Sequence, residues 1–407
     1  MASTFTWLDH SEHERRQMLD VIDLFRERDT RDELGLGTIR DAFADLFFPA
    51  TSTIQTRARY FFFIPWMYVE LERKHSPSAS VADQVRKYET RLIDALVEAG
   101  ETDGVLGSVA GKSLQRLPSN IYWQGLGILR IRTFPGSQPQ YYRSLDRFYL
   151  LKGRQTRDDD GEPAGGMLQA NWHPGLPEPP GDFPHKASLK LTRMEARYLQ
   201  ERITARAPDS LFRFLAERGR EVEELDFPWQ HPQSAEFPAR CQEQLHYARN
   251  FSEAMHGASL LYNLMLAELV ANDEWVSDYK AAMKEWAELV GARRGEVLAW
   301  DRVRFWQIVG SQGARVSRGT RQFVEGWVDL LLSEESLKRV ASGKPAQALI
   351  RERERGLKKS LARLDNRRAL ELWSGAAGTA QLNFRWRIAQ RILKDVYQGL
   401  SGHGRNA

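Results

Sequence analysis

The chain has 407 residues, of which 42% are hydrophobic and 28% are charged, and its formal net charge is +4. This composition excludes a disordered or collagen-like chain and is typical of a soluble globular protein. The length favours about two or three domains, and the small net charge excludes a molecule whose whole surface is basic.

Three features of the sequence bear on the compartment. Cys241 is the single cysteine, which excludes an internal disulfide and a cysteine-only metal cage and favours a reducing compartment. The N-terminus becomes charged before any apolar segment, unlike a secretory signal. The apolar run at 60–68 has nine residues, whereas a membrane span needs about 20. We therefore expect a cytoplasmic protein without a membrane span.

Residues 1–152 predict an N-terminal domain that mixes helices and strands. Ser11 and Glu14 have the spacing of a capping box, which predicts the start of a first helix. Apolar residues at helical spacing predict further helices over 39–46 and 81–99.

Two segments of this domain predict strands. The run YFFFIPW at 60–66 is short, rich in aromatic residues and interrupted by a proline, which is typical of a buried strand. A short helix over 119–126 precedes apolar and basic residues that alternate over 128–134. A short helix followed by a basic strand is typical of a winged-helix module, which we expect at about residues 80–150.

Residues 153–185, GRQTRDDDGEPAGGMLQANWHPGLPEPPGDFPH, are dense in glycine and proline and predict a surface linker. Trp172 lies within this segment, and an exposed tryptophan is costly. We therefore expect Trp172 to pack against a neighbouring surface.

Residues 186–407 predict a larger, all-helical domain. Thr192 and Glu195 form another capping box at its start. Helical periodicity then marks residues 248–270, 274–290, 297–309, 323–332, 346–364 and 382–400. The predicted fold class is α+β and mostly helical, with a mixed N-terminal domain and this helical C-terminal domain.

Charge is unevenly distributed along the chain. Residues 338–407 contain sixteen Lys and Arg against five Asp and Glu, which leaves residues 1–337 with a balance of −7. The C-terminal segment therefore predicts a basic arm that binds an anionic partner.

No residues have the spacing of a catalytic or metal site. His10 and His13 flank the expected helix cap at Ser11, and no second ligand cluster follows them. GSVAGKS at 107–113 has one residue too few between its glycines for a phosphate-binding loop. Asp278 lies in a helical pattern without clustered carboxylates. We therefore predict no catalytic residue, no metal and no cofactor.

Arginines in polar or aromatic surroundings are the more specific signal. Their planar guanidinium groups form paired, charge-assisted hydrogen bonds with phosphates. Arg315, Arg318 and Arg321 recur at every third position of a glycine-containing polar segment, so we expect them to be exposed and adjacent. The candidate nucleic-acid-binding residues are Arg57, Arg59, Arg116, Arg130, Arg132, Arg293, Arg294, Arg302, Arg304, Arg315, Arg318, Arg321, Lys358, Lys359, Arg385 and Arg387.

Several segments together carry a family resemblance. They are WLDHSEHERR, DELGLGTIRDAFADLFFPATSTIQTRARYFFFIPW, LQRLPSNIYWQGLGIL, FSEAMHGASLLYNLMLAE and LNFRWRIAQRILKDVYQGL. In these segments the chain resembles an uncharacterised bacterial family, domain of unknown function 6361. The family has no assigned activity, so no catalytic residues carry over. The resemblance implies an antiviral-island setting, in which helicase and phospholipase-D-like nuclease genes are neighbours.

We therefore expect a non-enzymatic, nucleic-acid-binding component of a bacterial antiphage defence system. The expected partners are nucleic acid, with DNA as the first candidate and RNA left open, and helicase or phospholipase-D-like nuclease subunits of a defence complex. Two alternatives stay open: a scaffold whose basic arm docks an acidic partner subunit, and a nuclease whose active-site residues are dispersed in the sequence.

Overall fold

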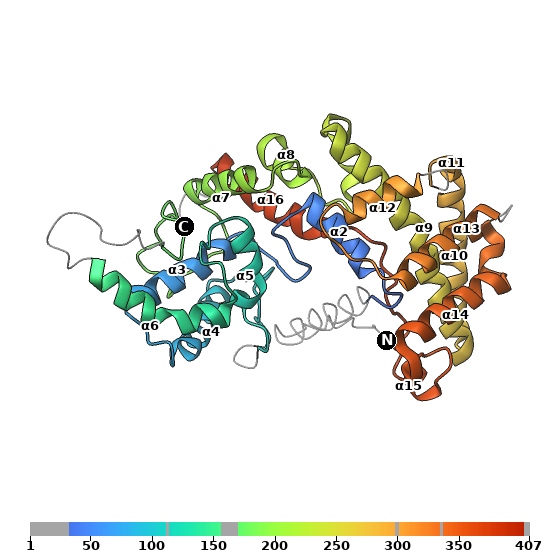
Figure 1. Cartoon of the computed structure of the whole chain (residues 1–407), viewed down its shortest axis with the longest axis horizontal. Helices are drawn as coiled ribbons and strands as arrows, with labels where there is room; N and C mark the ends of the chain where they lie inside the picture. Colours follow the sequence, from blue (N-terminus) through green and yellow to red (C-terminus); the bar gives the residue numbers. More distant parts are fainter. Residues whose placement is uncertain (1–31, 111–113, 156–169, 298–300, 334–336, 403–407) are drawn as a thin grey trace, which may run out of the picture. The chain divides into compact units, whose positions relative to one another are not determined.

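The computed structural model describes residues 32–110, 114–155, 170–297, 301–333 and 337–402. Within these ranges the chain forms helices and no strand, and its only β-type pairing is an isolated antiparallel bridge between Arg132 and Trp172 (Figure 1). The predicted α+β class is therefore wrong, because the described chain is all-helical. The predicted winged-helix element at 80–150 is wrong for the same reason, since a wing requires strands.

The chain divides into two compact units, each assembled from two separate stretches of sequence. Unit 1 comprises Met1–Phe43 and Gln242–Phe384, and unit 2 comprises Ala44–Cys241 and Arg385–Ala407. The predicted domain boundaries, with a linker at 153–185, stay a prediction.

Unit 2 is a set of helices packed through aromatic side chains. Helix α3 packs against α4 and α5, and the C-terminal helix α16 packs against α7 and α8 (Figure 1). The helices of this unit are α3 (Tyr60–Arg73), α4 (Val81–Glu98), α5 (Pro118–Ile128), α6 (Gln138–Gln155), α7 (Arg193–Arg206), α8 (Leu211–Arg218), η2 (Pro228–Gln230), η3 (Ser234–Glu236) and α16 (Trp386–Ser401).

Unit 1 contains the remaining helices, with the greater part of α2 and α9. Trp327 and Phe305 are buried at its centre, and α13 packs against α14. Its helices are α2 (Gly37–Phe47), α9 (Ala239–Val270), α10 (Asp273–Ala292), α11 (Arg294–Val297), α12 (Arg302–Gly310), α13 (Arg318–Ser333), η4 (Leu337–Ser342), α14 (Lys344–Lys358), η5 (Lys359–Leu361) and α15 (Arg367–Glu371).

The run at 60–66 is helical, so the predicted strand is wrong. It forms the first half of α3, and every side chain from Tyr60 to Tyr68 is buried. A helix that is buried all round has no polar face, and its sequence therefore lacks the helical period that would identify it. Pro65 lies inside α3 and does not end it. No described helix combines the length and apolarity needed to span a membrane.

The predicted strand at 128–134 is a helix end followed by a turn. Arg130 has a left-handed backbone with φ of 54°, and the amide of Ile131 donates to the carbonyl of Leu126 at 3.0 Å. This left-handed closure turns the chain back on α5. As a result Arg130 is exposed whereas Arg132 is only 8% exposed, so the two arginines do not share a strand face.

Several local predictions are confirmed. Thr192 and Glu195 form a reciprocal capping box at the start of α7. Helix α4 ends before Gly100, whose φ is 78°. Trp172 is buried and stacks on Tyr68, with ring centroids 5.4 Å apart. The helix predicted over 346–364 ends early, at Lys358. Ser11 and Glu14 lie outside the described residues.

Candidate nucleic-acid interface

Half of the predicted phosphate-binding side chains are engaged by carboxylates of the same chain. These eight cations are distributed over both units, and each pair lies within one unit. The pairs are Arg57–Asp395, Arg59–Glu195, Arg293–Glu253, Arg302–Glu325, Arg304–Glu243, Lys358–Glu33, Arg385–Asp45 and Arg387–Asp226.

Arg57 and Arg59 are structural residues of unit 2. Asp395 on α16 accepts hydrogen bonds from Arg57 Nε at 3.1 Å, from Arg57 Nη2 at 2.8 Å and from the Ala58 amide at 2.8 Å. Arg59 is 2% exposed and pairs with Glu195, the capping-box residue of α7, at 3.0 Å. A phosphate cannot reach the buried guanidinium of Arg59, and the half-buried guanidinium of Arg57 is already engaged by Asp395, so these two arginines hold helices together instead.

Arg132 and Arg294 donate to backbone carbonyls. The Arg132 guanidinium lies over the Trp123 ring at 4.5 Å and donates to the carbonyls of Trp123, Phe134 and Gly136. Arg294 Nη2 donates to the carbonyl of Leu331 at 3.1 Å. Buried carbonyl groups that no helix bond satisfies need such donors.

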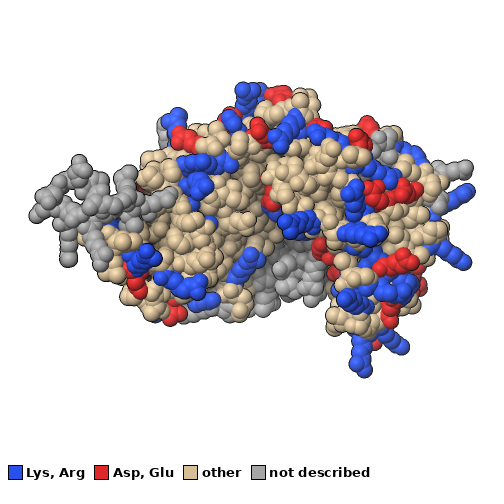
Figure 2. All heavy atoms as spheres, viewed as in Figure 1, with Lys and Arg blue, Asp and Glu red and all other residues tan. Residues whose placement is uncertain are grey.

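The predicted basic arm is partly internal to unit 1. Lys358 pairs with both Glu33 and Glu354, and its ammonium group lies 4.9 Å from the centre of the Tyr262 ring. Glu354 is fully buried and also accepts from the Tyr262 hydroxyl at 2.5 Å. On the face drawn in Figure 2, acidic and basic side chains lie next to one another at many places. The described surface is therefore not one continuous basic face.

Six candidates remain exposed and have no ion-pair partner within the described ranges: Arg116, Arg130, Arg315, Arg318, Arg321 and Lys359. Three of them lie around the first turn of α13. Ser317 caps this helix by accepting the Thr320 amide at 3.1 Å. Residues three apart on a helix are neighbours on its surface, and this first turn contains no acidic residue. The exposed arginines therefore lie at the positive end of the α13 dipole.

One of these arginines is ordered by an aromatic ring. The Arg321 guanidinium lies 5.1 Å from the centre of the Trp306 ring on α12. Trp306 Nε1 donates to Glu325 Oε1 at 2.5 Å, and Glu325 Oε2 accepts from Arg302 at 2.8 Å. We define the α12–α13 cationic surface as Arg315, Arg318, Arg321 and Trp306. Sequence reasoning missed Trp306, although its position between arginine-rich segments was a usable signal.

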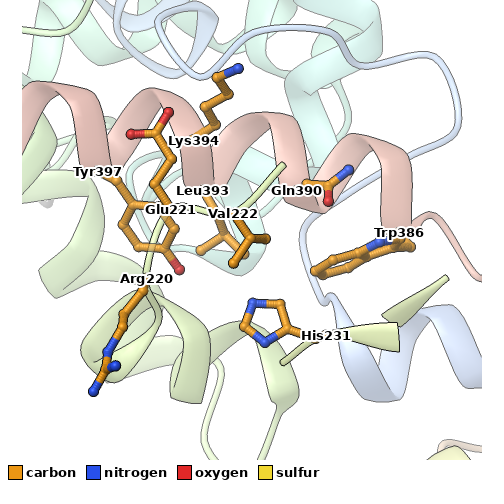
Figure 3. A pocket seen from close by; sticks show the side chains of 9 residues that line it. All are labelled: Arg220, Glu221, Val222, His231, Trp386, Gln390, Leu393, Lys394 and Tyr397. Atoms are coloured by element: carbon orange, nitrogen blue, oxygen red, sulfur yellow. The ribbon is translucent and has the colours of Figure 1, made fainter. Parts of the chain in front are cut away.

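Figure 3 shows a hollow in unit 2. Its cavity volume is about 20 Å³, far below the roughly 300–1,000 Å³ of small-molecule sites. The His231 ring faces Val222 and Leu393, whereas Arg220 and Lys394 extend away from it (Figure 3). Burial lowers the pKa of His231, so its imidazole is neutral at pH 7. The charged groups do not converge, and the hollow offers no catalytic arrangement.

No group of three or more His, Cys, Asp or Glu side chains able to hold a metal occurs among the residues that the structure describes. His10 and His13 lie outside that part of the chain. Cys241 is buried, and burial raises the pKa of its thiol to about 11, which leaves it protonated and unreactive at neutral pH.

The whole length of the chain was compared with known proteins. The model of a family of unknown function, DUF6361, matches residues 2–399. The chain belongs to this DUF6361 family. No curated protein and no solved structure matches it. Membership of DUF6361 therefore supplies no activity and no catalytic residues. The α12–α13 cationic surface is the feature that bears on function.

Proposed function

We propose that this DUF6361 protein is a non-enzymatic nucleic-acid-binding component of a bacterial antiphage defence system. In this proposal the α12–α13 cationic surface binds the phosphate backbone. The observation that carries the proposal is that Arg315, Arg318 and Arg321 occupy every third position at the start of α13, are exposed and have no ion-pair partner in the described residues. The defence setting and the helicase or phospholipase-D-like nuclease partners are supported only by the family resemblance, and the proposed cytoplasmic location rests on the single cysteine and the charged N-terminal sequence.

The number of free arginines sets the expected strength of binding. Three phosphate contacts give a slope of log affinity against log salt of about −2.7 for duplex DNA. Affinity should then fall about 40-fold between about 50 and 200 mM salt. Such contacts carry no base information, so binding should be independent of sequence.

Fluorescence anisotropy with a labelled oligonucleotide across a salt series tests the proposal. The variant R315E/R318E/R321E should lose binding at low salt and flatten the salt dependence. The matched control K280E/K284E/K344E changes the net charge equally, at exposed lysines of unit 1, and should retain most of the affinity. Equal losses of affinity in both variants would show that the net charge of the protein, and not these three arginines, determines binding. Absent binding at low salt would refute the proposal.

The scaffold alternative is favoured by a different observation in unit 1. Leu361 is 68% exposed and Leu372 is 83% exposed, and both lie close in sequence to the exposed cations Lys359 and Arg368. Exposed leucines beside cations suit an acidic partner with apolar side chains. Co-purification of such a partner that survives nuclease treatment and is lost in L361S/L372S would favour this second function.

A further inference from the structure

We infer that Trp306 and Arg321 form a stacking site for an unpaired nucleobase, so that the preferred ligand of the α12–α13 cationic surface is a single strand. This inference rests on the proposed function and deepens it. It is argued from the geometry of four side chains in unit 1: Trp306, Arg321, Glu325 and Arg302.

The indole of Trp306 is half-buried, and a hydrogen bond fixes its orientation. Its Nε1 donates to Glu325 Oε1 at 2.5 Å, and Glu325 in turn pairs with Arg302 at 2.8 Å. Arg302 also pairs with Asp329 at 2.7 Å. This chain of contacts holds the ring in one position before any ligand binds, which lowers the ordering cost of stacking.

The Arg321 guanidinium lies over the Trp306 ring and covers one of its faces, so a base on this side stacks on the planar cation above the indole. It lies 5.1 Å from the Trp306 ring centre, and the residue itself is exposed. Bases stack on aromatic rings and on guanidinium planes, and each stacked base contributes about 1–3 kcal/mol, equivalent to about 5–150-fold in affinity. Arg318 lies about one helical turn before Arg321 on α13, and Arg315 lies in the segment just before the helix; these exposed cations are available to the adjoining phosphates.

The acidic residues beside the platform do not oppose a strand strongly. Glu325 and Asp329 carry two negative charges, and their shared partner Arg302 offsets one of them. The one negative charge that remains is outweighed by the three arginines of the α12–α13 cationic surface. In a duplex the bases are already stacked and paired, so a duplex can use only the arginines. A single strand can use the arginines and the platform together.

Anisotropy titrations with three labelled probes of equal length, about 12 nucleotides, separate these contributions. The probes are a thymidine oligonucleotide, the same strand with abasic sites, and a duplex. The wild-type protein should bind the thymidine strand at least about fivefold more tightly than the other two. Equal affinities for thymidine and abasic strands would overturn the inference.

Three variants, W306A, R321K and W306F, test the stacking platform. W306A should reduce thymidine binding to the level of the abasic strand. It should lower duplex binding less, because Arg321 loses the ring that orders it but keeps its charge. R321K keeps the charge and loses the planar group, so it should lower the affinity for the thymidine strand and keep the salt dependence. W306F should retain most of the preference for the thymidine strand over the other two probes. If R321K and W306A bind every probe as the wild type does, the platform is not used.

The failures of the two proposals are distinguishable. Wild-type binding could depend on salt, be lost in R315E/R318E/R321E and be equally strong for all three probes. That result would contradict the stacking site and support the nucleic-acid proposal. No salt-dependent binding of any probe would remove both.

Discussion

Glu89 on α4 caps the N-terminus of α5. Its Oε1 accepts a hydrogen bond from the Ser119 amide at 2.6 Å, and its Oε2 accepts one from the Ser119 hydroxyl at 3.0 Å. The preceding residue, Leu117, has no side chain able to cap the helix, so the capping carboxylate comes from another helix. Glu89 is buried and forms no ion pair in the described structure.

The pH dependence of stability follows from this burial. Burial raises the pKa of Glu89 to about 7, although the Ser119 hydrogen bonds and the charge of Arg86 oppose the shift. Because the folded-state pKa lies above the unfolded value, the stabilisation is complete below about pH 4.5 and is lost as the pH rises through about 7. The loss should reach about 3 kcal/mol.

Urea unfolding at pH 5 and pH 8 measures this effect. E89Q mimics the neutral carboxyl, so it should match the wild type at pH 5 and exceed its stability at pH 8. E98Q, at an exposed position of the same helix, should keep the wild-type profile. Parallel profiles for E89Q and the wild type would exclude Glu89 as the titrating group.

Gly257 on α9 tests the packing of unit 1. A Cβ atom at this position would lie 2.2 Å from the Trp286 ring. G257A should therefore destabilise by about 1–3 kcal/mol, although alanine is the better helix former. G291A on α10 is the control, because nothing lies within 4 Å of its added Cβ, and it should stabilise by up to about 1 kcal/mol. Thermal unfolding compares the two; stabilisation by G257A would contradict the packing described here.

Arg130 has a backbone that glycine adopts without cost. Its φ of 54° is a left-handed conformation, so R130G should raise the free energy of unfolding by about 0.5–1 kcal/mol. R116G, at an exposed position without a positive φ, should give no gain. Chemical unfolding measures the free energy of unfolding of both variants. Equal changes in R130G and R116G would contradict the explanation from the backbone conformation of Arg130. Nucleic-acid affinity should be unchanged in R130G, because Arg130 is not part of the α12–α13 cationic surface.

The Arg57–Asp395 pair should contribute more than an exposed pair. Asp395 is buried and accepts three donor groups, so D395N leaves the Arg57 charge without its partner and should cost about 3 kcal/mol. The pair Arg73–Glu178 has side chains that are 61% and 74% exposed, and E178Q should cost no more than about 0.5 kcal/mol. Similar losses in the two variants would show that burial does not govern these pairs.

Local signals in the sequence identified much of the helical structure. The capping box of α7 and the end of α4 at Gly100 depend on neighbouring residues and were predicted. Helix α3 was not predicted, because burial on all sides removes the polar face that reveals a helix.

The sequence could not predict which arginines form internal ion pairs, because the partner carboxylate lies far away along the chain. Arg57 and Asp395 are 338 residues apart, and Arg59 and Glu195 are 136 apart. Arg315, Arg318 and Arg321 have no such partner in the described residues, and their expected exposure is confirmed.

The placement of α16 in unit 2 has a consequence for synthesis on the ribosome. A nascent chain exposes the Arg57 side chain long before Asp395 is translated, and the 338 residues that separate them take about 20–70 s at about 5–20 residues per second. During this interval the guanidinium and the apolar surface that α16 later covers are both open to water. Unit 2 therefore completes its fold only after α16 has been translated, and a premature stop before residue 386 leaves it without this helix.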